Sequence, residues 1–206
     1  LVNATIAALP LVWLYCLAAF LDHSDLGPLR NFGWIAWPST LVMSYFVLRL
    51  FEDVWWSPFA RAGHVGSAWL LWFLVTWAVA TAVAHLIPET PTWGQIAWSV
   101  VTSTLLVTFV RYGARITWPV QRHESLYGVV VPLAPVAFLV VWVFWACTQD
   151  GNAAPLPYVP FLNPIEVAQA FAVIAGCAWW IRGRNVGFIP ASIVPHVVST
   201  LGRRAF

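Results

Sequence analysis

The stretch LYGVVVPLAPVAFLVVWVFWAC, residues Leu126–Cys147, carries no charged side chain and is long enough to cross a lipid bilayer as a helix. Five further stretches are mostly apolar and of similar length: Val2–Leu21, Phe32–Leu50, Val65–Ile87, Gln95–Val110 and Pro164–Ile181. A seventh, Phe188–Leu201, is weaker because Pro190 and Pro195 interrupt it. The sequence therefore predicts an all-α polytopic transmembrane bundle of six spans and a weaker seventh, forming one domain over residues 1–206.

The composition supports the same class. Hydrophobic residues make up 61% of the chain and charged residues only 9%, whereas soluble domains carry about 25% charged residues. The net charge of +2 comes from scattered basic residues, which argues against a nucleic-acid partner. Lysine is absent, which excludes a retinal Schiff base. The chain opens inside an apolar run without an initiator methionine, so we expect it to be a fragment of a longer polytopic protein.

The arginines predict which side of the membrane each connection faces. Apart from Arg30, which lies beside Asp22 and Asp25, they occur in alternate connections between the predicted spans, and the positive-inside rule places those connections in the cytoplasm of a bacterial inner membrane. The proline-rich segment 155–164 then lies on the periplasmic side. If Phe188–Leu201 crossed the membrane, Arg203 and Arg204 would fall on the outer side, so we favour a segment that does not cross. The candidate contacts to lipid headgroups are Arg111, Arg115, Arg122, Arg182 and Arg184.

The segment PLPYVPFLNPIE, Pro155–Glu166, is apolar but too rich in proline to be a helix. Its prolines favour an extended backbone, and we call residues 155–164 the strap. Asn163 is predicted to cap the following helix, with Pro164 in its first turn. Glu166 is placed to interact with the positive end of that helix and to reach back to the cap.

The strap and the helix that follows it also carry a family resemblance. PLPYVPFLNPIEVAQA resembles a signature of large bacterial multi-pass membrane proteins that share a domain of unknown function, number 2339. HVGSAWLLWFLVTWAVA at His64–Ala80 and ITWPV at Ile116–Val120 are similar to further parts of that family. The resemblance runs from about His64 to the end of the chain and implies the C-terminal portion of a larger bundle. It carries over no catalytic residue.

Motifs for metal or cofactor chemistry are not visible in the sequence. There is no HExxH or CxxC pattern, and the adjacent acids Glu52 and Asp53 would diverge on a helix. His64 and His123 have comparable predicted depth, as a pair of haem ligands would need, but both are expected to be interfacial or capping residues. We therefore predict no cofactor and no metal site.

Three functions remain open from the sequence. The first is a non-catalytic structural or accessory component of a cell-envelope complex, with the lipid bilayer, other membrane subunits or the rest of a longer chain as partners. The second is a membrane-embedded enzyme or flippase-like factor for lipid-linked glycan. Its outer site would come from Tyr158, Asn163, Glu166 and His85. A secondary transporter ranks third because no acid lies at the middle of a span.

Overall fold

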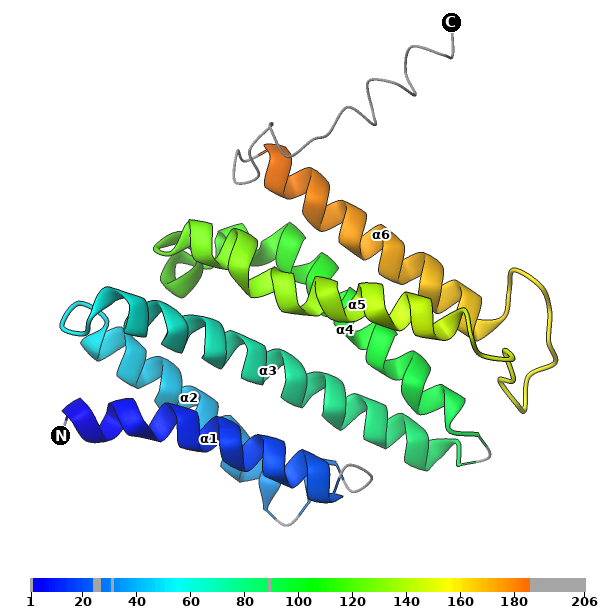
Figure 1. Ribbon diagram of the computed structural model, residues 1–206, viewed down its shortest axis with the longest axis horizontal. Coiled ribbons are helices and arrows are strands. Elements are labelled where there is room, and N and C mark those ends of the chain that lie inside the picture. The colour runs from blue at the N-terminus through cyan, green and yellow to red at the C-terminus, as the bar shows by residue number, and fades with distance from the viewer. Residues whose placement is uncertain (1, 24–26, 31, 89, 186–206) are drawn as a thin grey trace, which may run out of the picture.

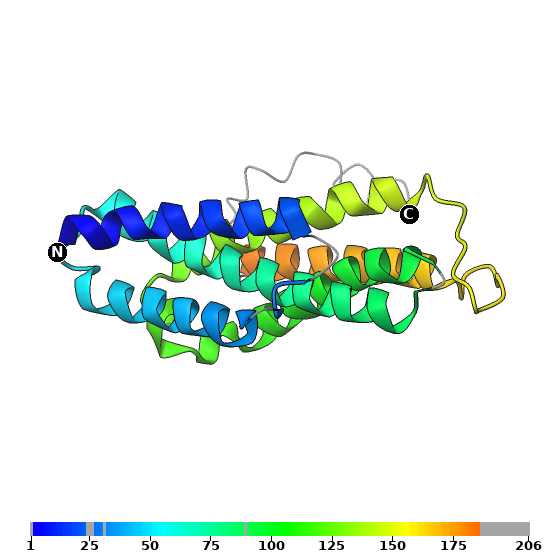
Figure 2. The same ribbon diagram turned by 90° about the horizontal axis from the view of Figure 1, so that it is seen from below.

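Six long helices form an elongated bundle in the computed structural model, which describes residues 2–23, 27–30, 32–88 and 90–185. They run back and forth along the long axis (Figures 1 and 2). The helices are α1 (Val2–His23), α2 (Gly33–Phe51), α3 (Ser57–Leu86), α4 (Thr92–Tyr112), α5 (Val131–Ala146) and α6 (Pro164–Asn185). The predicted all-α bundle is confirmed.

The connection between α4 and α5 is a compact hairpin of short turns. It comprises η1 (Gly113–Arg115) and two π-helical turns, η2 (Thr117–Gln121) and η3 (Leu126–Val130). Trp118 inside it has an extended backbone, φ −122° and ψ 136°, as expected for a residue that precedes a proline. Figure 1 shows this hairpin at the same end of the bundle as the turn between α2 and α3.

The count of spans differs slightly from the prediction. Within the described residues, α2, α3, α4 with η1, η3 with α5, and α6 are long and apolar enough to cross a membrane. For α1, the described side chains give only the shorter apolar stretch Leu11–Asp22. The seventh segment Phe188–Leu201, with Arg203 and Arg204, lies outside the described residues.

Helix α3 is longer than its hydropathy alone suggested. It begins at Ser57 instead of Val65, with Pro58 in the first turn, where a missing backbone N–H costs nothing. Arg61 and His64 therefore belong to the helix and not to the preceding connection. This correction decides the geometry of the site, because it fixes His64 on a rigid element.

The core of the bundle is built on close contacts of α4 with α3 and with α6. Small side chains permit the approach: Ser99 and Ser103 on α4 and Ala175 on α6 are fully buried. Near the N-terminal end of α4, a Cβ added to Gly94 would lie 3.2 Å from the Cβ of Ala84 in α3. A larger residue at this position would therefore push α3 and α4 apart.

Helix α1 packs less closely. Cys16 joins a buried cluster with Trp37 of α2 and Leu70, Leu74 and Trp77 of α3. Beside this cluster lies a cavity of about 510 Å³, bounded mainly by aromatic rings from α1, α3, α4 and α5. Its lining includes Trp13, Phe20, Trp69, Trp72, Phe73 and Trp98.

Candidate functional site

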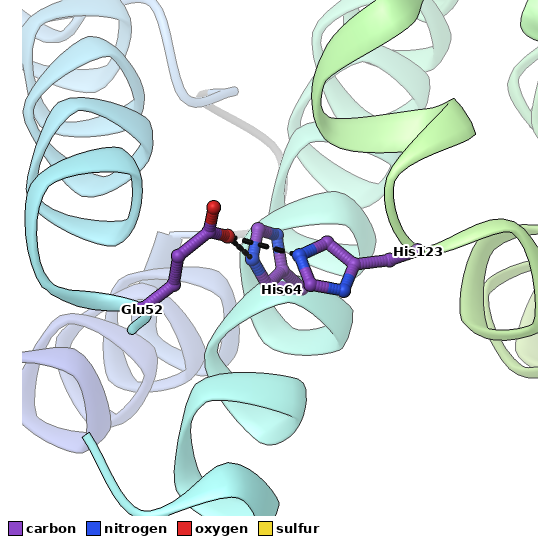
Figure 3. Close-up of side chains that lie close together, drawn as sticks. All are labelled: Glu52, His64 and His123. Carbon is purple, nitrogen blue, oxygen red and sulfur yellow. Dashed lines mark hydrogen bonds and ion pairs between the residues drawn. The ribbon is translucent and has the colours of Figure 1, made fainter. Parts of the chain in front are cut away.

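Glu52, His64 and His123 meet at the end of the bundle formed by the α2–α3 turn and the α4–α5 hairpin (Figure 3). Glu52 directly follows α2, and its backbone N–H donates to the carbonyl of Leu48 at 2.9 Å. His64 lies two turns inside α3, and His123 lies between η2 and η3. The three side chains therefore come from three different segments: the end of α2, the interior of α3 and the α4–α5 hairpin.

One carboxylate oxygen lies within hydrogen-bonding distance of both imidazoles. Glu52 Oε2 lies 2.9 Å from His64 Nε2 and 2.9 Å from His123 Nε2. The two rings are tilted against each other with their centroids 4.4 Å apart. The side chains of Glu52 and His64 are 2% and 0% exposed, while that of His123 is 24% exposed. Of the three side chains, that of His123 is therefore the one nearest the surface of the bundle.

The second carboxylate oxygen is held by two donors. Trp118 Nε1–H donates to Glu52 Oε1 at 3.1 Å, and Arg122 Nη1 lies 3.1 Å from the same oxygen. The guanidinium also donates through Nη2 to Asp53 Oδ1 at 2.6 Å. Arg122 therefore bridges the buried acid Glu52 and the exposed acid Asp53.

These contacts keep the buried acid ionised. Burial by itself would raise the pKa of the Glu52 carboxyl. The hydrogen bonds from the two imidazoles and the Trp118 indole, with the positive charge of Arg122, outweigh that effect and hold the pKa below its ordinary value. The site consequently offers a carboxylate at neutral pH.

The ring of His64 is fixed from its other side. Its Nδ1 lies 3.2 Å from the hydroxyl of Tyr127, which opens the span formed by η3 and α5. Tyr127 is itself buried against Val120 and Leu126. Two imidazole nitrogens and one carboxylate oxygen within 4.8 Å of one another are the donor types that bind transition-metal ions, so these three residues could hold one.

The residues predicted for an outer site lie at the opposite end, where the strap meets α6 (Figure 1). The Tyr158 hydroxyl donates to Glu166 Oε1 at 3.0 Å, and the backbone N–H of Phe161 donates to Glu166 Oε2 at 2.6 Å. The glutamate thus reaches back beyond the cap, to the strap itself. Its charge and hydrogen bond raise the pKa of the Tyr158 hydroxyl.

Asn163 ties the same region together. Its Oδ1 accepts the backbone N–H of Ile165 at 3.0 Å, and its Nδ2 donates to the carbonyl of Gly151 at 2.6 Å. His85 is exposed near the end of α3, and no described contact joins it to these residues. Tyr158, Asn163 and Glu166 are therefore brought together, while His85 stands apart.

The predicted headgroup arginines lie in three different environments. Arg111 and Arg115 lie over the ring of Tyr112, with 5.9 Å and 5.0 Å from guanidinium carbon to ring centroid. Arg182 and Arg184 are exposed in the last turn of α6. Arg122 differs because its guanidinium is committed to Glu52 and Asp53.

Sequence reasoning missed the cluster. His64 was expected at an interface or a cap, but it is fully buried two turns inside α3. Glu52 and Asp53 do diverge, yet divergence leaves Glu52 free to turn inward toward two histidines from other segments. The usable signal was that Glu52, His64 and His123 were all assigned to boundaries on one side of the membrane.

The fold and the site together define a multi-pass α-helical membrane protein with a buried His–His–Glu cluster at one end of its bundle. The family described as predicted membrane protein (DUF2339) matches residues 1–196, and the chain belongs to this family. The match confirms the resemblance noted in the strap and extends it to the first two helices. No curated protein and no solved structure matches the chain.

Proposed function

We propose that this membrane protein is a non-catalytic structural or accessory component of a bacterial cell-envelope complex. The observation that carries the proposal is the position of its ionisable residues. The acids, arginines and histidines of the described helices lie near the helix ends, and the one farthest inside is His64, two turns into α3. A charge at mid-depth is the usual mark of an ion or substrate pathway, and the centres of these described helices carry no acid, arginine or histidine.

The glycan-handling alternative would need a polar cavity at the strap. Tyr158 already forms a hydrogen bond with Glu166, and Asn163 with the carbonyl of Gly151, which leaves few free groups for a sugar or phosphate. The cavity beside α1 is lined mostly by aromatic and apolar side chains, and no residue of the strap lines it. These observations support the structural role over an enzyme or flippase-like factor, and a secondary transporter ranks third for want of a charge at mid-depth.

The proposal includes an orientation in the bacterial inner membrane. Every described arginine except Arg30 lies at the end of the bundle that carries the His–His–Glu cluster, namely Arg49, Arg61, Arg111, Arg115, Arg122, Arg182 and Arg184. The positive-inside rule assigns that end to the cytoplasm and the strap to the periplasm. The arginines there would contact anionic headgroups, each worth about 1 kcal/mol near the surface.

Purification from native membranes tests the role. The protein would be extracted in mild detergent after crosslinking, and co-purifying proteins and lipids would be quantified by mass spectrometry. We expect a small set of envelope proteins at stoichiometric amounts. Recovery without any stoichiometric protein partner, together with turnover of a lipid-linked glycan, would overturn the proposal in favour of the enzyme.

A further inference from the structure

The geometry points to a transition-metal site of the zinc class formed by Glu52, His64 and His123. All three ligand atoms lie within 4.8 Å of one another, and each imidazole presents Nε2 to the same carboxylate oxygen. Two histidines and one carboxylate form a known three-residue ligand set for Zn²⁺ that leaves a fourth position open. Ca²⁺ and Mg²⁺ prefer oxygen ligands, so two imidazoles argue against them.

The distances from the carboxylate oxygen to the two imidazoles need little adjustment to accept an ion. Ligands about 2.0–2.1 Å from a tetrahedral Zn²⁺ lie about 3.3 Å from each other. The carboxylate oxygen is now 2.9 Å from each Nε2, so these two distances would lengthen by a few tenths of an ångström, and all three ligand atoms already lie within 4.8 Å of one another. Without an ion, the same contacts are hydrogen bonds donated by the two Nε2–H groups to the carboxylate.

The surroundings orient each ligand for such an ion. When His64 Nδ1–H donates to the Tyr127 hydroxyl, its Nε2 lone pair points into the cluster. Trp118 and Arg122 occupy Glu52 Oε1 and leave Oε2 for the metal. Hydrogen-bonded partners of this kind fix the ligands of metal sites and raise affinity.

Charge and access are also compatible with a cation. Glu52 supplies one negative charge, and the positive charge of Arg122 is balanced by Asp53 at 2.6 Å. His123 is 24% exposed, whereas His64 is fully buried, so an ion would enter past His123 at the surface of the bundle. The bound ion would join the α2–α3 turn to the α4–α5 hairpin more firmly than hydrogen bonds alone.

The site is tested on the protein purified in detergent and stripped with a chelator. Zn²⁺ is titrated against a chromophoric competitor, and Co²⁺ is added separately to record the visible spectrum of its coordination sphere. We expect one tight ion per chain and a tetrahedral Co²⁺ spectrum. His123→Ala should weaken Zn²⁺ by more than about 100-fold, because it removes a ligand and not only an outer partner.

Two further variants sharpen the result. Tyr127→Phe should weaken Zn²⁺ by about 10–100-fold while keeping a tetrahedral Co²⁺ spectrum, as expected for loss of a positioning hydrogen bond. His85→Ala, which changes an exposed histidine at the opposite end, should leave both readouts unchanged. Because His123 is partly exposed, its variant is the one expected to fold normally, and helical content by circular dichroism would check this.

Two results would overturn the metal site. One is wild-type protein that binds Zn²⁺ no more tightly than His123→Ala. The other is equal weakening by His85→Ala. The metal site goes beyond the role proposed above and fails separately from it: an enzyme could bind Zn²⁺ here, and a non-catalytic subunit could lack it.

Discussion

Glu52 Oε2 lies 2.9 Å from His123 Nε2, although the two residues are 71 positions apart in the chain. The same oxygen lies 2.9 Å from His64 Nε2, twelve positions away. One carboxylate therefore joins the α2–α3 turn, helix α3 and the α4–α5 hairpin at one end of the bundle. Removing a buried charge that contacts three segments should lower the free energy of unfolding substantially, because the buried N–H donors that contacted it are left without an acceptor.

Replacing Glu52 by alanine should destabilise the protein by about 3 kcal/mol, since it leaves the imidazoles and the Trp118 indole without their acceptor in a buried site. Asp53→Ala is the matched control. The Asp53 side chain is 76% exposed and its pair with Arg122 is worth about 1 kcal/mol or less. Denaturation in mixed micelles, followed by circular dichroism, measures both. Equal losses for the two variants would contradict the assignment of Glu52 as the central residue.

Gly151→Ala should loosen the strap. Gly151 has φ +73°, and an added Cβ would meet Tyr158 at 3.2 Å and the Asn163 amide nitrogen at 3.3 Å. We expect a cost of about 1–3 kcal/mol for the strained backbone. It should appear as faster proteolysis of the strap in detergent.

Gly176→Ala provides the opposite control. It lies inside α6, and an added Cβ would meet no atom within 4 Å beyond the adjacent residues and backbone of its own helix, so the change should stabilise the helix by up to about 1 kcal/mol. If the strap of Gly151→Ala were cleaved at the wild-type rate, the turn at Gly151 would not be what holds the strap in place.

The contact between Tyr158 and Glu166 should depend on pH in the alkaline range. The folded-state pKa of Tyr158 is raised, so the contact is fully present below the ordinary tyrosine pKa of about 10 and is lost as the pH rises through the raised value. The difference between the ultraviolet titrations of wild type and Tyr158→Phe should show one tyrosine that ionises at a higher pH than free tyrosine. A Glu166→Gln variant should return that titration toward the ordinary value, and no change on this substitution would refute the pairing.

Labelling from one side of the membrane tests the orientation. In a protein with Cys16, Cys147 and Cys177 replaced by serine, Leu156→Cys in the strap should react with an impermeant maleimide from the periplasm. Ala114→Cys in the arginine-rich hairpin should react only after the membrane is opened. Both positions are exposed, so accessibility to solvent is matched. The reverse pattern would invert every assignment of side made from the arginines.

The sequence was sufficient for the helices but not for the cluster. Long uncharged stretches fix helical spans directly, and Asn163-Pro164 predicted the start of α6 at the residue where it occurs. His64 was misplaced because its helix begins in the less apolar stretch Ser57–Gly63, where hydropathy is a weak guide. The meeting of Glu52 with His123 depends on how two distant connections pack, and no local pattern encodes that.

The hollow behind α1 has a consequence for how this protein responds to its surroundings. Its walls are indole and phenyl faces such as Trp13, Phe20 and Trp98, and acyl chains are as apolar as the side chains they would touch. Hydrocarbon from the bilayer can fill such a space at little cost, so folding has no strong drive to close it. We therefore expect the position of α1 to depend on both the protein and the surrounding lipid. A change in membrane thickness or fluidity should shift α1 before it shifts the closely packed helices α3, α4 and α6.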